Sequence, residues 1–504
     1  MASAPSTVSR SLASVWRTLR SMRTALILLL LVAAGSVAGS LVPQVANSPA
    51  RVAALYRQRP LLARVYESLG LFDVYGSWWF TLLYVLLLIS LASCLLPRSR
   101  ALLRTVRQRA QPLRDLGGMR HFASGVVPDP PDRALERARR VLRRRRYRVS
   151  APDGAAGGLA AEKGAAREVG SLLFHWSFFL LLVGVAYGKG TGFTGVATVT
   201  EGETWTETHA SYDVPPREGR FFRESMHAGF QLRVLDFDVS YRENGLPQEF
   251  VSRVDVLDGG RPVGSEEIRV NDPLGVRGVK VYQSGYGWAP VIEVRQEGRL
   301  LASGPVVFVT DDPRDQRVPW RGVVKLPSLR PQVGIELRLL PDSEAFVLGA
   351  PMLEARSPFL AFTAYRGDLR LTAAQSVFSL DRTGLVEWER GGIGRGETAR
   401  LPGDLEISFP ELRQYTQFLV KRDAGTGIVL WSAVLLLAAL LPALYSSRRR
   451  VWVRAQPDPG GSRLEVAGFA LQRKAAFEEE FDALAKALIP SGASERAARV
   501  GVRP

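Results

Sequence analysis

Four segments with essentially no charge and the length of a membrane span constrain this chain more than any other feature. Each holds about 19–21 residues, enough for a helix to cross a hydrocarbon core about 30 Å thick. The first follows three arginines but has no small-residue cleavage site with polar sequence directly behind it, so we expect a permanent helix and not a cleaved signal. The sequence predicts an integral membrane protein, with transmembrane helices over residues 24–44, 77–96, 170–188 and 427–446.

The net charge of +17 is concentrated in alternate segments between these helices. Residues 1–23 hold 4 Lys and Arg and no acidic residue, residues 98–169 hold 18 basic against 7 acidic residues, and residues 447–504 hold 11 against 7. By contrast, residues 191–425 hold 28 basic against 33 acidic residues. A basic excess in alternate loops follows the positive-inside rule, which places both termini and the central basic loop in the cytoplasm. Because topology accounts for the charge, we expect no nucleic-acid partner.

The predicted chain alternates between the two sides of a plasma (inner) membrane. Its cytoplasmic parts are an N-terminus, a basic loop and a tail with an amphipathic helix, over residues 1–23, 97–169 and 447–504. Its extracytoplasmic parts are a short loop, residues 45–76, and a large domain, residues 189–426.

The large domain is expected to be built of strands. It is rich in short runs that alternate apolar and polar residues, such as FQLRVLDFDVSY and QEFVSRVDVL, separated by Gly, Pro and Asp clusters. Many short strands at this spacing are typical of an all-β sandwich or a barrel-like domain. The predicted fold class is therefore four transmembrane α-helices plus a large extracytoplasmic, mostly-β domain.

The cytoplasmic segments carry two helical patterns. DRALERARRVLRRRRY predicts a helix in the basic loop. In the tail, apolar residues spaced by four, three and four mark one face of an amphipathic helix, at Phe477, Phe481, Leu484 and Leu488. This face could dock on a partner or on the chain's own cytoplasmic loop.

Small residues punctuate the membrane segments. Gly35 with Gly39, and Gly184 with Gly188, have the GxxxG spacing that lets helices approach closely. Cys94, the single cysteine, lies in the second segment, where we expect a packing residue and not a reactive thiol. One cysteine also excludes an intrachain disulfide and dithiol exchange within this chain.

The usual catalytic signatures are missing: the sequence has no P-loop, GxSxG, HExxH or cysteine–histidine metal cluster. Of the four histidines, we expect His121, His209 and His227 to be ordinary loop or surface residues. His175 differs because an ionisable side chain inside a membrane helix is rare and usually faces a bundle interior or a bound group. Two interpretations stay open from the residues alone. The imidazole either hydrogen-bonds a neighbouring helix or the headgroup zone, or it is an axial ligand of haem iron among the surrounding aromatic residues.

The order of parts resembles the ResB (CcsB) family of cytochrome c biogenesis proteins over nearly the whole chain. The stretches that carry the resemblance are GSLVPQ, LGLFDVYGSWWF, FHWSFFLLLVGV, GFQLRVLDFDVSY, VNDPLGVRGVKVYQSGYG, QYTQFLVKRDAGTGIVLW and RRRVWVR. Each is weak alone, but they occur in the right order on a topology obtained independently.

The resemblance implies a subunit of a two-protein cytochrome c synthase. In that system a ResB-like subunit pairs with a ResC (CcsA) subunit, and together they move haem b outward and deliver it to apocytochrome c for attachment at CxxCH. The family's membrane histidine, taken as a haem ligand, maps onto His175, so the resemblance implies His175 as an axial ligand of the haem iron. The family's tryptophan-rich haem-handling motif belongs to the partner and is absent here.

This division of labour sets further expectations. One axial histidine leaves the other face of the iron open, so the second ligand should come from elsewhere, most simply a partner helix. Without a dithiol pair this chain depends indirectly on thiol-reducing proteins, and we do not expect it to be catalytic alone. Two alternatives remain: an assembly factor or apocytochrome chaperone for the partner that binds no haem, and a membrane sensor with an extracytoplasmic ligand domain.

Overall fold

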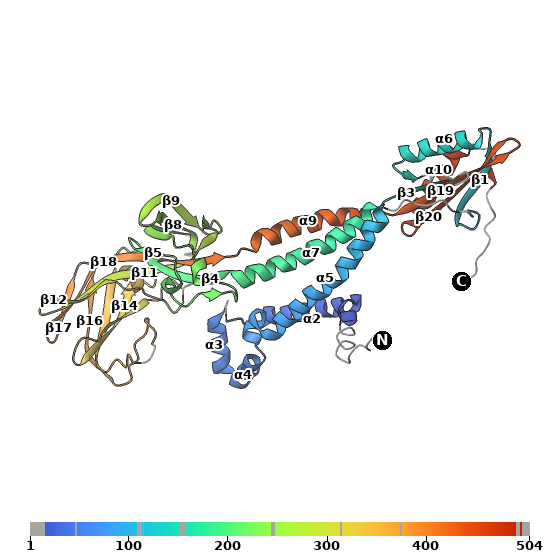
Figure 1. Ribbon diagram of the computed structural model, residues 1–504. Coiled ribbons are helices and arrows are strands. Elements are labelled where there is room, and N and C mark those ends of the chain that lie inside the picture. The colour runs from blue at the N-terminus through green and yellow to red at the C-terminus, as the bar shows by residue number, and fades with distance from the viewer. Residues whose placement is uncertain are drawn as a thin grey trace. The chain divides into compact units, whose positions relative to one another are not determined.

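The computed structural model describes residues 16–45, 48–107, 113, 115–150, 158–242, 247–312, 315–372, 375–489 and 494–495 of the 504 (Figure 1). The chain divides into two compact units. One combines Met1–Val185 with Thr426–Pro504. The other is the continuous stretch Ala186–Gly425, called the β domain below.

All four predicted membrane segments are helical. They are α2 (Met22–Leu41), α5 (Trp78–Arg107), α7 (Ala166–Thr191) and α9 (Thr426–Tyr445), each long and apolar enough to cross a membrane. Two of them are longer than their apolar windows, because α5 runs on to Arg107 and α7 begins at Ala166. The extensions consist mainly of Arg, Leu, Ala and Glu, which favour helix even where the sequence is polar.

The first glycine pair brings α2 close to the 3-10 helix η1 (Leu71–Gly76) and to the start of α5. A Cβ added at Gly35 would lie 3.1 Å from the Phe80 ring, and one added at Gly39 would lie 3.1 Å from the Tyr75 ring. Both contacts are tighter than ordinary van der Waals distance, so a larger residue at either position would push the aromatic rings away. The GxxxG spacing thus marks a packing surface within this chain.

A compact helical loop joins α2 to α5. It consists of α3 (Pro49–Gln58), α4 (Pro60–Ser68) and the 3-10 helix η1 (Leu71–Gly76). The buried side chain of Gln44 ties its two ends together. Its Nε2 donates to the carbonyls of Val42 and Leu71, both at 2.9 Å, and its Oε1 accepts from the amide of Val74 at 3.1 Å. Gln44 therefore links the sequence stretches GSLVPQ and LGLFDVYG.

We expect Gln44→Leu to loosen η1. The substitution keeps the size of the side chain but leaves the Val74 amide and the Leu71 carbonyl without their partner, at a cost of about 1–3 kcal/mol for each buried group. Hydrogen exchange of residues 69–76 in the purified protein should become faster. Gln58→Leu is the matched control, because Gln58 is exposed at the end of α3. Equal exchange rates in the two variants would contradict this role of Gln44.

The basic loop and the tail fold together as one α+β domain within the first unit. Its antiparallel sheet has the order β2-β3-β19-β20-β1-β21. The loop contributes β1 (His121–Val127), β2 (Arg148–Ser150) and β3 (Gly158–Lys163), and the tail contributes β19 (Arg449–Asp458), β20 (Gly461–Ala470) and β21 (Ser494–Glu495). Helices α6 (Pro131–Arg144) and α10 (Lys474–Leu488) pack against it (Figure 1).

The core of this domain explains the amphipathic pattern of the tail helix. The apolar face of α10 packs with Ala138 and Leu142 of α6 and with Val451 and Val453 of β19 in one buried cluster. Trp452 points to the opposite face of the sheet and packs with Leu116. Of the two docking places considered for the tail helix, the structure shows the chain's own loop.

One arginine at the start of the tail links the α+β domain to helix α7. Arg448 lies between α9 and β19 and pairs with Glu162 of β3 at 3.1 Å and with Glu168 of α7 at 2.7 Å. Only 7% of the Glu162 side chain is exposed. This arginine belongs to the stretch RRRVWVR, so that stretch has a structural role in closing the α+β domain.

The β domain consists of three antiparallel sheets. A seven-stranded sheet has the order β10-β11-β18-β4-β6, with β12 paired to β11 and β17 paired to β18, and two four-stranded sheets have the orders β13-β14-β15-β16 and β5-β7-β8-β9. The seven-stranded sheet contains β4 (Phe193–Thr200), β6 (Arg217–Glu218), β10 (Leu274–Val276), β11 (Val279–Gln296), β12 (Arg299–Pro305), β17 (Thr398–Leu401) and β18 (Leu405–Arg422).

The smaller sheets cover different ends of the long strands β11 and β18. The first contains β13 (Trp320–Leu326), β14 (Gln332–Leu340), β15 (Phe359–Gly367) and β16 (Leu385–Gly394), with the short helix α8 (Ser343–Val347) between β14 and β15. The second contains β5 (Thr204–Thr206), β7 (Gln231–Tyr241), β8 (Pro247–Asp258) and β9 (Arg261–Arg269). The 3-10 turns η2 (His209–Ser211) and η3 (Glu224–Met226) lie between β5 and β7.

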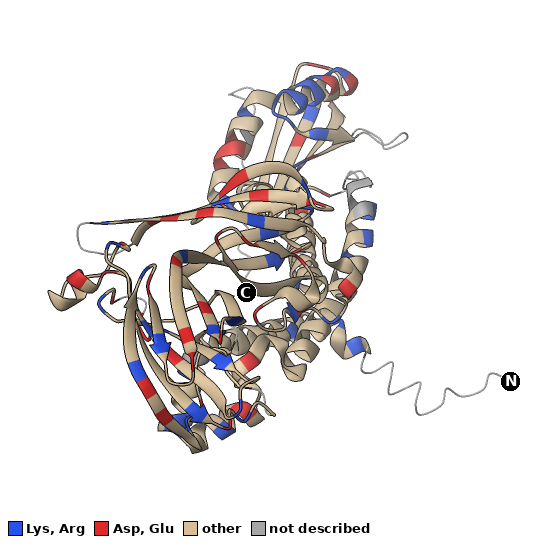
Figure 2. Cartoon of the chain, turned by 90° about the vertical axis from the view of Figure 1, so that its left-hand side faces the viewer, with Lys and Arg blue, Asp and Glu red and all other residues tan. Residues whose placement is uncertain are grey.

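Two separate cores follow from this arrangement. One joins Trp288 of β11 and Phe409 of β18 to strands β13–β15, and the other joins Val281 of β11 and Phe418 of β18 to strands β4, β7 and β8. The predicted mostly-β domain is therefore confirmed, with sandwich-like packing on both halves of the same two strands. Figure 2 shows basic and acidic residues interspersed along these strands.

Candidate functional site

His175 lies within α7, and its ring orientation is fixed by its own helix. The imidazole Nδ1 is 2.6 Å from the carbonyl oxygen of Ser171, one turn earlier. A carbonyl oxygen only accepts, so Nδ1 carries a proton, and in the neutral imidazole Nε2 is then the nitrogen with the lone pair. A hydrogen bond of this kind from the second ring nitrogen is the usual way in which proteins orient a metal-ligating histidine.

The imidazole is turned away from α9. Gly170 and Gly184 of α7 face that helix, because a Cβ added at Gly170 would lie 2.8 Å from the Ala443 amide and one at Gly184 would lie 3.0 Å from Ile428. Ser177 falls midway on the same stripe and is fully buried. At 3.6 residues per turn, His175 is roughly 160° round the helix from Ser177.

Another side of α7 contacts α5. The Trp176 Nε1 donates to Ser99 Oγ at 2.9 Å, and the Tyr84 hydroxyl donates to the Leu182 carbonyl at 2.7 Å. Trp176 is thereby engaged in helix packing. Phe174 stands edge-on to the His175 ring, with the ring centroids 5.4 Å apart. Among the described residues no hydrogen-bond partner is found for Nε2, and the ring lies on a half-buried, aromatic surface of α7 that neither hydrogen bond to α5 occupies.

This arrangement fits one axial ligand of a haem iron. A neutral imidazole with a free, oriented nitrogen is a standard axial donor, and an aromatic surface suits a flat apolar macrocycle. The other three histidines lie outside the membrane helices, at His121 in β1, His209 in η2 and His227 after η3. His175 is therefore the one histidine within the four candidate membrane helices.

Cys94 and His121 have structural surroundings. The Cys94 thiol donates to the Arg20 carbonyl at 3.0 Å, so it belongs to the packing between α5 and the start of α2. His121 packs edge-on against Phe477, with ring centroids 5.3 Å apart, and burial there lowers the pKa of the imidazole.

His209 and His227 meet in the β domain. Both lie in connections between strands, as expected, but the side chain of His227 is only 6% exposed. Each contacts the carboxylate of Glu218. Sequence reasoning gave no reason to group them, because the residues between them follow no ligand-spacing pattern and only the fold brings them together.

The resemblance stretches of the β domain mostly hold strands in register. VNDPLGVRGVKVYQSGYG forms the hairpin β10–β11, with its turn at Arg277 and Gly278, both of which have positive φ. Where β11 bulges, Gln283 Oε1 accepts from Ser252 at 2.7 Å and from Thr416 at 3.0 Å. Ser252 and Thr416 are fully buried. These stretches therefore have a folding role that needs no ligand.

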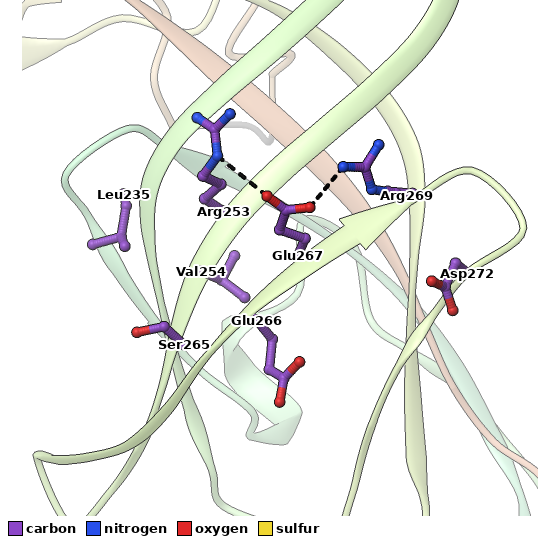
Figure 3. A pocket seen from close by; sticks show the side chains of 8 residues that line it. All are labelled: Leu235, Arg253, Val254, Ser265, Glu266, Glu267, Arg269 and Asp272. Atoms are coloured by element: carbon purple, nitrogen blue, oxygen red, sulfur yellow. Dashed lines mark hydrogen bonds and ion pairs between the residues drawn. The ribbon is translucent and has the colours of Figure 1, made fainter.

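A shallow pocket of about 550 Å³ opens on β8 and β9 (Figure 3). Two of its arginines share one carboxylate, because Glu267 contacts Arg253 at 3.4 Å and Arg269 at 2.7 Å. The hydrogen bond and charge of Arg269, followed by those of Arg253, hold the pKa of Glu267 below its usual value. Glu266 and Asp272 also line the pocket, and a lining of this polarity does not suit haem.

The chain has four helices long and apolar enough to span a membrane, and the one that carries His175 is followed directly by a large β domain. These features define a class of polytopic membrane protein. Residues 22–482 match the ResB-like family, and the chain belongs to that family. The chain is 28% identical over 473 residues to a protein named cytochrome c biogenesis protein CcsB from a Synechococcus species, covering 92% of this chain and 90% of that protein. A second Synechococcus protein of that name is 29% identical over 497 residues, covering 96% and 93%. A CcsB protein of Trichormus variabilis is 30% identical over 275 residues, which are 53% of this chain and 57% of the relative's length.

Proposed function

We propose that this chain is the haem-handling subunit of a two-subunit cytochrome c synthase. It helps to move haem b across the membrane and to deliver it to apocytochrome c for covalent attachment. The observation that carries the proposal is the state of His175, with Nδ1 committed to Ser171 and Nε2 free on the side of α7 away from α9. Membership of the ResB-like family and relatives named for cytochrome c biogenesis support a role in that process.

Within this role, His175 binds the iron through Nε2, and the Ser171 carbonyl keeps the ring in the right tautomer. The hydrogen bond also raises the basicity of Nε2, which strengthens the ligand. When bound, haem supplies the porphyrin that becomes attached at a CxxCH motif of the apocytochrome. The packing of α7 on α5 and α9 keeps the imidazole at a defined place along the helix.

The partner is a ResC/CcsA-like membrane subunit. It would supply a second ligand to the haem iron, because the other three histidines of this chain lie outside its membrane helices. It also shares the haem transiently with His175. Thiol-reducing proteins keep the apocytochrome cysteines reduced, since one cysteine allows no dithiol cycle here. Covalent attachment is then a property of the complex and not of this chain alone.

We place the protein in the plasma membrane with both termini inside. The positive-inside rule supports this orientation, because α6 and the strands around it carry the arginine-rich sequences. The β domain then lies outside, on the side where apocytochrome c is folded. Its mixed surface charge suits contacts with a polypeptide better than contacts with a membrane surface (Figure 2).

Deletion of the gene in its own organism tests this function. We expect c-type cytochromes to disappear from a haem-stained gel of membrane proteins and to return when the full chain is expressed. Cytochromes with non-covalent haem serve as the internal control and should be unchanged in a spectrum of the same membranes. Normal c-type cytochromes in the deletion strain would contradict the proposal and favour a sensor function.

A further inference from the structure

The β domain contains a cluster of four side chains in which each contacts the next, in the order Glu207, His227, Glu218 and His209. Glu207 follows β5, His209 opens η2, Glu218 ends β6, and His227 follows η3. All four therefore lie between β5 and β7, in a part of the chain with little regular structure. Called the His209–His227 cluster below, it belongs wholly to the second compact unit.

Glu207 is the innermost member of the cluster. Its side chain is fully buried, and its carboxylate has four hydrogen-bond partners. They are the Tyr212 hydroxyl at 2.8 Å, His227 Nδ1 at 2.5 Å, and the backbone amides of Ala228 and Gly229 at 2.5 and 3.3 Å. A carboxylate surrounded by donors is an acceptor only, so Nδ1 of His227 supplies a proton. Burial, followed by the bond to Glu207, raises the pKa of Tyr212 above its ordinary range, which keeps that hydroxyl protonated.

The opposite nitrogen of His227 faces a second carboxylate. His227 Nε2 lies 3.4 Å from Glu218 Oε1, and His209 Nδ1 lies 2.6 Å from the same oxygen. The three ligand atoms all lie within 4.8 Å of one another. Two imidazole nitrogens and one carboxylate oxygen form a donor set found in zinc sites that keep an open position. A buried carboxylate behind one of the histidines is the usual support for such a ligand.

The contacts of the cluster differ in length. His209 Nδ1 lies at hydrogen-bond distance from Glu218, at 2.6 Å, whereas His227 Nε2 lies 3.4 Å from the same oxygen. The second distance is longer than a charge-assisted hydrogen bond, which measures about 2.7–2.9 Å. Ligand atoms about 2.0–2.2 Å from a tetrahedral ion stand about 3.3 Å apart, which matches the His227–Glu218 separation.

The exposed member of the cluster gives access. The side chain of His209 is 42% exposed and that of Glu218 is 23% exposed, whereas His227 is 6% exposed. An ion can therefore enter from the His209 side without unfolding the domain. On binding, it replaces the proton between His209 and Glu218, and that proton goes to solvent. The 2.6 Å contact then opens by less than 1 Å, which an exposed side chain on a short turn can accommodate.

We propose that His209, Glu218 and His227 bind a divalent first-row transition metal, with zinc as the ion that fits best. Two neutral imidazoles favour zinc over magnesium or calcium, which prefer all-oxygen sites. Glu207 is a positioning residue that orients His227. This proposal does not depend on haem binding at His175.

Metal binding fastens the connection between β5 and β7 to β4. The Phe193 ring of β4 packs on His227 with centroids 4.9 Å apart. Glu218 pairs with Phe193 in the β4–β6 ladder, and the Phe221 amide donates to the Gly190 carbonyl at 2.8 Å. The ion therefore links η2, β6 and the residue after η3, all within the connection that packs beside the start of β4. A fourth coordination position stays open for water or for a side chain of a partner.

The test is zinc binding by the full chain, purified in detergent with an affinity tag that contains no histidine. The protein is stripped with a chelator, loaded with Zn²⁺, passed through a desalting column and analysed for metal. We expect one zinc per wild-type chain. His209→Ala and Glu218→Gln should each weaken zinc binding by about 10–100-fold or more. Mutation of a residue that only supports a ligand already lowers metal affinity by that factor. His209 is half-exposed, so its variant should fold even if a His227 variant does not.

Two histidine variants outside the cluster are the matched controls. His121→Ala and His175→Ala each remove one imidazole and should keep one zinc per chain. Cobalt gives a second readout, because a tetrahedral Co²⁺ site has strong visible bands that should be present in wild type and absent in His209→Ala. The proposal is overturned if wild type retains no zinc, or if His209→Ala and Glu218→Gln retain as much as the controls.

Discussion

Cells that carry His175→Ala in place of the wild-type chain are expected to lose their c-type cytochromes. We expect haem staining of these cytochromes to fall by about tenfold or more. Mutation of a residue that only supports a metal ligand lowers affinity or activity by about 10–100-fold, and removal of the ligand itself should have at least that effect. Alanine offers no lone pair to iron, but it leaves a space the size of the lost ring. Imidazole added to the growth medium should therefore restore part of the yield, because it can occupy that space and supply the missing nitrogen.

The controls separate a ligand from a structural residue. His121→Ala also removes an imidazole, but from the α+β domain, and should leave cytochrome c yield unchanged. An immunoblot of membranes must show that the His175→Ala chain is inserted at its normal level. A normal yield with a stably inserted His175→Ala chain would contradict the haem-ligand assignment. It would favour the alternative of an assembly factor that binds no haem.

A second large effect is expected in the α+β domain. Phe477 of α10 is fully buried against α6 and β19, and Phe477→Ala removes an aromatic ring from that core. Large-to-small substitutions of this type cost about 3–5 kcal/mol. Because the loop and the tail form one domain, the loss of stability should appear in the loop as well as in the tail. We expect faster hydrogen exchange in residues 121–127 of the loop as well as in residues 461–470 of the tail.

Phe469 supplies the matched control for this experiment. It lies on β20 of the same sheet, but 49% of it is exposed. Phe469→Ala removes an identical ring without opening a cavity, so exchange in the domain should change little. If Phe477→Ala affected only the tail, then loop and tail would not form one cooperative domain.

The features that sequence alone predicted are those with a strong local signal. The four apolar windows and the apolar face of α10 repeat over many residues, so hydropathy and periodicity suffice to find them. The shared sheet of loop and tail was not predicted, because β1 pairs with β20, and β3 with β19, across roughly three hundred residues of sequence or more. Short strands in a polar, arginine-rich context have no pattern that announces such distant partners.

The two candidate sites show the same limit. His175 stood out because a histidine is conspicuous in an apolar helix, but its bond to Ser171 and its position away from α9 required the structure. Glu207, Glu218 and His227 are ordinary residues in their local sequence. What makes them a site is the burial of Glu207 and the return of the chain past β4, and both are properties of tertiary packing. Gln44 is a similar case, since its three bonds join stretches that the sequence shows only as separate motifs.

The central claim is that His175 of this chain binds haem iron. The most direct measurement is the visible absorption spectrum of the chain purified with its ResC/CcsA-like partner, compared among wild type, His175→Ala and His121→Ala at equal protein concentration. We predict a haem absorption band in wild type and His121→Ala, its loss in His175→Ala, and its partial return when imidazole is added. A band of equal height in His175→Ala without imidazole would contradict the account.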